Sequence, residues 1–110
     1  MQTYIQVTTT VEKRDDAEKL ARTILEQRLA ACVQIAPCTS LYWWQEAIEK
    51  AGEYVCSMKT RTDLFPALEQ LLAREHPYDV PEILALPITG VSAAYAAWLE
   101  QELARPTTPV

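Results

Sequence analysis

The sequence predicts an α+β fold in which two helices cover one face of a four-stranded sheet and a further helix ends the chain. Its 110 residues suit a single domain, which we expect to span residues 1–103, with residues 104–110 as a disordered tail. Segments rich in β-branched residues and segments with helical apolar spacing follow one another in the order βαββαβ. Hydrophobic residues make up 49% and charged residues 23%, which is typical of a globular chain with one modest core.

The first half of the chain predicts a strand, a helix and a long strand. Residues 3–10 are rich in Thr, Val and Ile and favour a strand. Residues 15–30 place Ala, Leu and Ile at helical spacing, and Asp15 with Glu18 fits an acidic capping box at the helix start. Residues 32–44 then predict the long strand.

The second strand is expected to lead through a turn into a third. Pro37 donates no ladder hydrogen bond, so we expect the second strand to bulge there or to run along the sheet edge. Residues 46–52 predict the turn and residues 53–60 the third strand. Alternation within that third strand places three side chains on one face, namely Tyr54, Cys56 and Met58.

The remaining elements are a helix, a short strand and a last helix. Thr62 or Asp63 is the expected cap of the second helix, and Pro66 lies in its first turn, where a missing N–H costs little. Residues 83–88 form a short apolar strand, and Ser92 caps the last helix. This order is the ferredoxin-like two-layer arrangement with an added C-terminal helix.

A two-layer sandwich leaves one sheet face uncovered. The run Tyr42-Trp43-Trp44 would place at least one large aromatic side chain on that uncovered face. Adjacent strand residues point to opposite faces, so Trp43 and Trp44 cannot both pack beneath the same helices. One interpretation is that the terminal helix covers the second face, or that the hairpin tip exposes one Trp. The other, which we favour, is that the long hairpin pairs with further copies of the chain, with Tyr42, Trp43 and Trp44 at the oligomer interface.

Composition excludes several classes of function. The net charge is -5 and Lys and Arg do not cluster, which argues against nucleic-acid binding. Two glycines are too few for a Gly-rich phosphate loop. No apolar run approaches the roughly 18 residues of a membrane span, and the first residues do not resemble a signal peptide. We therefore expect no membrane partner and a cytoplasmic protein.

Three cysteines, Cys32, Cys38 and Cys56, form no CxxC pair, so neither a disulfide framework nor a zinc knuckle is indicated. Cys32 and Cys38 lie roughly 20 Å apart in an extended segment, too far to share one ion. Cys56 and Met58 are about 7 Å apart on one face, which is marginal for a soft ion such as Cu(I). The alternative is that Cys32 and Cys56 are small buried residues, with Cys38 the more accessible.

A proline-stiffened loop from His76 to Glu82 displays polar side chains, which indicates either a binding surface or a helix C-cap whose His bonds the last carbonyls. Lys59, at a strand end, is either an anion partner or simply solvated. No Ser–His–Asp order and no convincing carboxylate pair appears. An enzyme that uses Lys59, His76 and Glu82 together is therefore the weakest hypothesis.

These motifs resemble the CutA family of divalent-cation-tolerance proteins. The resemblance runs over about residues 3–103, and its most specific part is the His-Pro-Tyr-x-x-Pro-Glu element. The segments that carry it are 28–33 (RLAACV), 40–44 (SLYWW), 59–60 (KT), 76–83 (HPYDVPEI), 86–88 (LPI), Tyr95 and 98–99 (WL).

The resemblance implies a ferredoxin-like subunit in a tight homotrimer similar to that of the PII signalling proteins. It further implies a cytoplasmic, non-enzymatic protein of tolerance to copper and other divalent ions, with no organic cofactor. Polar residues that cluster near the subunit interface in the family would correspond here to Lys59, His76, Tyr78, Glu82 and Trp98.

The sequence departs from the family where copper-binding members carry a Cys and a second His, because Thr9 and Glu75 stand there. This leaves a harder ligand set, Glu75, His76 and Glu82, which is weaker for Cu(I). Glu46 also takes the place of the usual turn glycine.

Two functions follow. The first is a trimer that binds copper or another divalent cation weakly near the subunit interface. The alternative is a PII-like sensor that binds a small anionic ligand in the intersubunit cleft, with Lys59, Tyr78 and Trp98 as ligand-binding residues.

Overall fold

A computed structural model describes residues 3–105. Its element order confirms the predicted βαββαβ chain with an added helix. Residues 106–110 of the expected tail, and residues 1–2 of the expected domain, lie outside the described residues. The elements are β1 (Tyr4–Val11), α1 (Arg14–Glu26), β2 (Cys32–Trp44), β3 (Ala47–Arg61), a 3₁₀ turn (Thr62–Leu64), α2 (Phe65–Glu75), β4 (Leu84–Ile88) and α3 (Ala93–Glu102).

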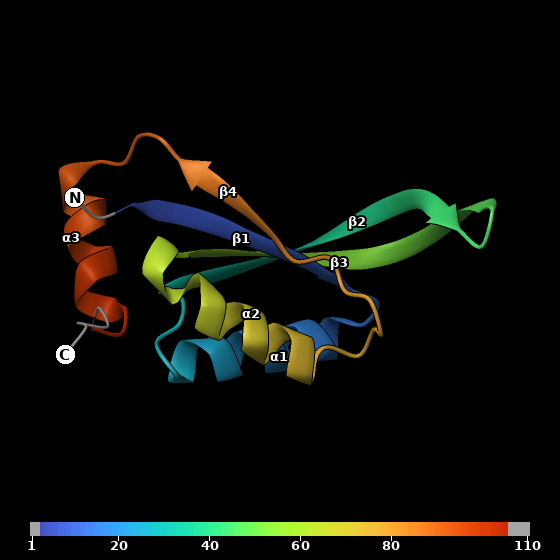
Figure 1. The fold of residues 1–110 in the computed structure, drawn as a ribbon, viewed down its shortest axis with the longest axis horizontal. Helices are drawn as coiled ribbons and strands as arrows, with labels where there is room; N and C mark the ends of the chain where they lie inside the picture. Colours follow the sequence, from blue (N-terminus) through green and yellow to red (C-terminus); the bar gives the residue numbers. More distant parts are fainter. Residues whose placement is uncertain (1–2, 106–110) are drawn as a thin grey trace.

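The four strands form one antiparallel sheet in the order β2-β3-β1-β4. Figure 1 shows α1 and α2 side by side beneath one face of this sheet, which confirms the ferredoxin-like arrangement. β2 is an edge strand, as Pro37 requires, and its pairing with β3 continues through Pro37 and Tyr54 without a bulge.

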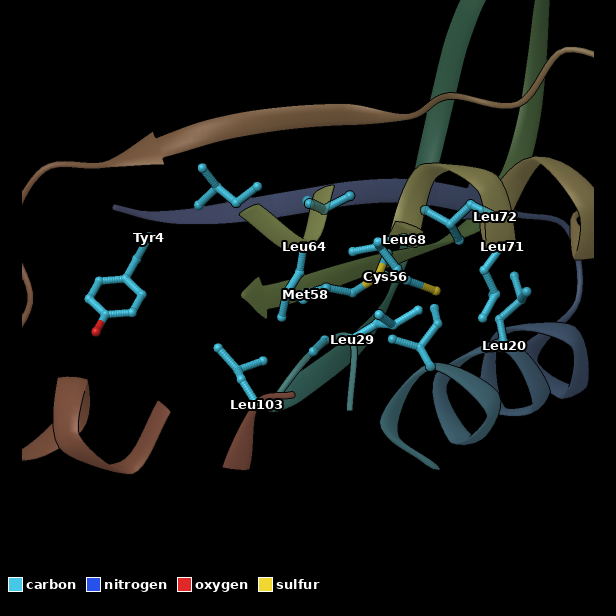
Figure 2. Close-up of a cluster of buried hydrophobic side chains, with 14 of the residues drawn as sticks. Tyr4, Leu20, Leu29, Cys56, Met58, Leu64, Leu68, Leu71, Leu72 and Leu103 are labelled. Carbon is cyan, nitrogen blue, oxygen red and sulfur yellow. The ribbon is translucent and has the colours of Figure 1, made fainter. Parts of the chain in front are cut away.

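The core lies between the sheet and the two helices. Val7 of β1 and Met58 of β3 are paired neighbours, and both are fully buried. Figure 2 shows the sheet and helix side chains that meet there, among them Leu20, Leu68 and Met58. Burial of each large aliphatic side chain contributes about 1.5–3 kcal/mol relative to exposure. The predicted alternation along β3 is confirmed, because the face that carries Cys56 and Met58 is the buried one.

The β2–β3 hairpin extends beyond the rest of the sheet as a two-stranded arm, which gives the molecule its longest dimension of 47 Å (Figure 1). Its turn consists of Gln45 and Glu46, with φ angles of 48° and 67°. The expected turn over residues 46–52 is wrong, since β3 already begins at Ala47 and Gly52 lies within the strand. An alternation of buried and exposed side chains could not reveal this part of the strand. Near the hairpin tip almost every residue is exposed, whichever face of the hairpin it lies on.

The first helix differs from its prediction at both ends. It begins at Arg14, and its cap residue Lys13 makes no side-chain capping bond, so the capping box of Asp15 and Glu18 does not form. Asp15 instead lies in the first turn, where its negative charge interacts favourably with the positive end of the helix dipole and stabilises the helix.

The helix ends at Glu26, before the expected residue 30, because Arg28 takes a left-handed φ of 58°. The N–H of Leu29 then donates to the carbonyl of Ile24, and that of Arg28 to the carbonyl of Leu25. These two bonds form a Schellman motif with Arg in the place usually held by glycine.

The predicted starts of the other two helices are confirmed for α3 and only in part for α2. Thr62 and Asp63 form a 3₁₀ turn before α2 and provide no side-chain cap, whereas Pro66 lies in the first turn as predicted. Ser92 Oγ accepts a hydrogen bond from the backbone N–H of Tyr95 at 3.2 Å, so the predicted cap of α3 is confirmed.

Helix α3 lies at the end of the sheet opposite the arm (Figure 1). The interpretation that this helix covers the second sheet face is therefore wrong for the part of the sheet that carries the Trp pair, and Trp43 and Trp44 are 73% and 54% exposed. None of the described helices has the length and apolar content needed to span a bilayer.

Candidate functional site

An open groove of about 810 Å³ lies between the arm and the loop that joins α2 to β4. Its arm side includes the apolar and aromatic residues near the hairpin tip, and its loop side includes Tyr78 and Glu82. The lining residues are Thr10, Thr39, Ser40, Leu41, Tyr42, Trp43, Trp44, Glu53, Tyr78, Asp79, Val80 and Glu82.

His76 begins this loop and is buried, with 8% of its surface exposed. Its Nε2 lies 2.9 Å from the carbonyl oxygen of Thr10 and 3.0 Å from Thr9 Oγ1. A carbonyl only accepts, so Nε2 carries the proton. Nδ1 accepts the backbone N–H of Tyr78 at 3.0 Å. Both ring nitrogens of the neutral imidazole are therefore engaged within the chain, and burial lowers the pKa of His76.

His76 also ends α2, and its backbone N–H donates to the carbonyl of Leu72 at 2.9 Å. The C-cap interpretation is thus correct for the position of the residue. The imidazole, however, bonds to the end of β1 rather than to the last helix carbonyls. Its role is to hold the start of the loop against the sheet.

Tyr78 continues the network from the loop to the arm. Its Oη donates a 2.7 Å hydrogen bond to Glu53 Oε2, and its ring lies 4.9 Å from that of His76. Burial, together with this hydrogen bond to a carboxylate, raises the pKa of Tyr78. Glu53 itself is only 9% exposed. No local pattern indicates this burial, because Glu53 is a charged residue in a strand and its partner is 25 positions away in the chain.

The groove is acidic. Glu53, Asp79 and Glu82 line it, and its lining contains no Lys, Arg or His. Among residues 3–105, the ion pairs of the structure do not involve Glu53. The charge of the groove therefore favours binding of a cation over binding of an anion.

The expected metal set of Glu75, His76 and Glu82 is not brought together. Glu75 lines a separate groove of about 120 Å³ beside α1 and accepts a 3.3 Å bond from Arg74 Nε. Glu82 lines the large groove, and both nitrogens of His76 are occupied. Within residues 3–105, no three His, Cys, Asp or Glu side chains are grouped so that they could hold a metal ion.

The expected ligand set of Lys59, Tyr78 and Trp98 is likewise divided within one chain. Lys59 Nζ donates to Gln34 Oε1 at 2.9 Å on the sheet face away from α1 and α2. Trp98 lies on α3, with its ring 5.4 Å from that of Tyr95. Of the three, only Tyr78 lines the groove.

The thiols do not form a metal site either. Cys56 and Met58 share a face, as predicted, but both are in the core, and burial raises the pKa of Cys56 to about 11. Cys38 is half-buried, and so is Cys32, which corrects the expectation that Cys32 is a buried core residue.

The arm and the open sheet face expose large apolar side chains. Leu41, Trp43 and Ile48 on the arm are 66%, 73% and 63% exposed. On β4, Leu84 and Leu86 are each 52% exposed and lie on the face that α1 and α2 leave bare. Exposed apolar side chains that gather in patches mark interaction sites in other proteins.

Known proteins share both the sequence and the fold of this chain. The model of the family "CutA1 divalent ion tolerance protein" matches residues 5–102. The divalent-cation tolerance protein CutA of Thermus thermophilus is 42% identical over 93 residues, which are 84% of this chain and 90% of the relative. That of Pyrococcus horikoshii is 38% identical over 98 residues, or 89% of this chain and 96% of the relative.

The chain spans about half the length of the chloroplastic CutA proteins of rice and Arabidopsis thaliana, at 55% and 53% of those relatives. Among solved structures, CutA1 of Pyrococcus horikoshii superposes with a TM-score of 0.89 at 36% identity, covering 92% of this chain and 99% of that one. The periplasmic divalent cation tolerance protein CutA of Archaeoglobus fulgidus superposes with a TM-score of 0.86 at 33% identity, covering 93% and 98%. The chain therefore belongs to the CutA1 divalent ion tolerance protein family.

Proposed function

We propose that the chain acts as a non-enzymatic, cytoplasmic homotrimer in divalent-cation tolerance, and that it holds metal ions, copper among them, weakly near the subunit interface. Family membership supports the tolerance role, because relatives of similar length bear the name divalent-cation tolerance protein. The observation that carries the binding site is the acidic groove, with Glu53, Asp79 and Glu82 on its lining and no basic residue among them.

The ligand chemistry of the groove favours weak binding. Carboxylate oxygens are hard ligands that suit Mg²⁺, Ca²⁺ and Mn²⁺. They lack the softer donor atoms that bind copper tightly. We place Glu82 at the cation and assign His76 to holding the loop, since both of its ring nitrogens are engaged. A cation bound in this way keeps most of its water and exchanges readily.

The arm and the sheet edges support the assembly. Tyr42, Trp43 and Trp44 are 43%, 73% and 54% exposed, and an aromatic buries about 150–250 Å² when it is covered. A closed ring of copies would cover this surface and protect the edge strands β2 and β4. With -5 charges on each chain, three copies carry about -15, which attracts cations to the assembly.

Titration calorimetry with Cu(II) tests the cation site. We expect saturable heat for the wild type and for Glu49→Gln, a matched control on the exposed part of the arm that does not line the groove. Glu82→Gln should bind Cu(II) several-fold more weakly, because it loses a charged oxygen ligand without a change in size. Equal affinities for all three proteins would contradict the proposed site.

One observation favours the sensor alternative. Lys59 is half-buried, and its ammonium bonds to the neutral Gln34 rather than to a carboxylate of the described chain. An anionic ligand bound between subunits would give the Lys59 ammonium a negatively charged partner in addition to Gln34. Thermal shift with small carboxylates and phosphates tests it, because a bound ligand raises Tm by mass action. A shift in the wild type that is absent in Lys59→Met would support the sensor, and no shift at millimolar ligand would oppose it.

A further inference from the structure

The loop between α2 and β4 is held in place at few points. His76 ends α2, and Ile83, just before β4, packs against the core. Between them, Pro77 and Pro81 have no backbone N–H to donate. In the part of the chain that the structure describes, no hydrogen bond between backbone groups involves residues 77–82. A segment of this kind opens locally at a low cost in free energy, so its closed position depends on the side chains that hold it.

Two hydrogen bonds of Tyr78 hold the loop closed. Its backbone N–H donates to Nδ1 of His76 at 3.0 Å, and its hydroxyl donates to Glu53 at 2.7 Å. His76 is fixed in turn, because its Nε2 lies 2.9 Å from the carbonyl oxygen of Thr10 and 3.0 Å from the hydroxyl of Thr9. The imidazole therefore connects the loop to the end of β1.

The bond between His76 and Tyr78 exists only while the imidazole is neutral. Nδ1 accepts the N–H of Tyr78 through its lone pair, and a proton on Nδ1 would set two donors against each other at 3.0 Å. Nε2 cannot take this proton, because it already carries the one that it donates to the Thr10 carbonyl. Protonation of the ring thus breaks the bond to Tyr78 rather than weakening it.

Carboxylates face the ring from two elements. Glu53 on β3 and Asp16 on α1 favour the imidazolium, and they oppose the burial that lowers the pKa of His76. The other titratable groups beside the ring are Glu75, which precedes it in α2, and Tyr78, whose ring lies 4.9 Å away. Opening of the loop exposes the imidazole and returns its pKa toward the ordinary 6.5, so acid favours the open loop.

We propose that His76 is an acid-sensitive latch: a proton on Nδ1 releases Tyr78 and lets residues 77–82 leave the arm, while the sheet and the helices stay folded. The same proton loosens the contact between loop and arm, because Tyr78 also carries the hydroxyl that bonds to Glu53. The latch does not rest on the proposed metal binding, since all its contacts lie within one chain.

Hydrogen exchange of the Tyr78 amide between about pH 7.5 and pH 5 tests the latch in the wild-type protein. The chain contains one histidine, so the imidazole NMR signals report the protonation of His76 without ambiguity. We expect the protection factor of the Tyr78 amide to be constant above about pH 7 and to fall by up to about tenfold per pH unit below pH 6.5. The amide of Ala31, which donates to the carbonyl of Lys59, should keep its protection throughout.

Three results in the wild type would overturn the proposal. The first is a Tyr78 amide that stays equally protected after the ring signals of His76 show protonation. The second is a Tyr78 amide that is already unprotected at neutral pH. The third is a simultaneous loss of protection at Tyr78 and Ala31, which would mean unfolding of the whole chain instead of local release.

Two variants assign the effect to the imidazole. His76→Gln cannot titrate and retains an N–H for the Thr10 carbonyl, so its Tyr78 protection should not depend on pH. Glu53→Gln removes a neighbouring carboxylate and leaves the latch in place. Its acid dependence should persist, with the midpoint of the His76 ring signals shifted to lower pH. Acid dependence that survives in His76→Gln, or that disappears in Glu53→Gln, would assign the release to a carboxyl group and contradict the latch.

Discussion

The hydroxyl of Tyr78 donates a 2.7 Å hydrogen bond to Glu53, and this single contact ties the loop after α2 to the base of the β2–β3 arm. His76 secures the other end of the same segment, because its ring bonds both to the end of β1 and to the backbone N–H of Tyr78. The groove thus has one wall on the arm and one on a loop that this network holds in place.

Tyr78→Phe should reduce the free energy of unfolding by about 1–3 kcal/mol, because the carboxylate of Glu53 then loses its hydrogen bond from the Tyr78 hydroxyl while it remains buried. Urea denaturation followed by circular dichroism measures the change. Tyr42→Phe is the matched control, since that hydroxyl makes no hydrogen bond within residues 3–105 and Tyr42 is 43% exposed. Equal midpoints for both variants would show that the Tyr78–Glu53 bond contributes nothing.

The stability that His76 contributes should depend on pH. Burial lowers its pKa in the folded chain below the ordinary 6.5, although the Thr10 carbonyl, Glu53 and Asp16 oppose this. The unfolded chain therefore binds the proton more readily, so the contribution is complete above pH 6.5 and is lost as pH falls through the lower folded value.

Denaturation at a series of pH values, for the wild type and for His76→Gln, isolates this effect. The advantage of the wild type over the variant should be constant above about pH 7 and should shrink toward about pH 5. An advantage that grows on acidification would contradict the neutral, doubly bonded imidazole. Nitrogen NMR of the imidazole provides a direct check that the proton is on Nε2.

Glu46→Gly should stabilise the hairpin. Glu46 has a φ of 67°, a left-handed conformation that costs a residue with a Cβ about 1–2 kcal/mol, whereas glycine adopts it freely. After the entropy that glycine loses on folding, we expect a gain of about 0.5–1 kcal/mol. Ala51→Gly, in the extended part of the same arm, should instead destabilise by a similar amount. Thermal unfolding of both proteins tests the turn, and a lower Tm for Glu46→Gly would contradict it.

Arg61 should prove essential for the docking of α3. It is fully buried, and its guanidinium bonds to Asp63, to Glu100 and to the carbonyl of Ala104. Arg61→Met should cost about 3 kcal/mol, because it leaves these acceptors without their partner.

Hydrogen exchange at the α3 amides should rise together with that loss of stability. Arg14→Ala is the control, since its ion pair with Glu18 is exposed and worth less than about 1 kcal/mol. If the two variants were equally stable, the cluster around Arg61 would have no net role.

Local patterns predicted most of the fold. β2 has the predicted limits, and the alternation of Cys56 and Met58 identifies the buried face of β3. The misses occur where a residue adopts a conformation that its type does not signal. Arg28 ends α1 in a left-handed conformation, and the Gln45-Glu46 turn lacks the Asn-Gly or Asp-Gly pair that announces such turns.

The candidate site was less predictable, because it depends on contacts between distant segments. The loop residues Tyr78 and Glu82 were identified from their motif, but nothing in the sequence near Glu53 shows that it is buried against Tyr78. The anchoring role of His76 is equally hidden in the sequence, because its partners come from a strand 66 or 67 positions earlier in the chain.

Sedimentation equilibrium tests the proposed assembly of three copies of the chain through the exposed arm. We expect a species of three times 12.4 kDa, about 37 kDa, that persists on dilution to micromolar concentration. We also expect Trp43→Ser combined with Trp44→Ser to shift the mass toward that of the single chain, since both side chains are solvent-exposed in one copy. A wild-type mass of 12.4 kDa at micromolar concentration would contradict the claim.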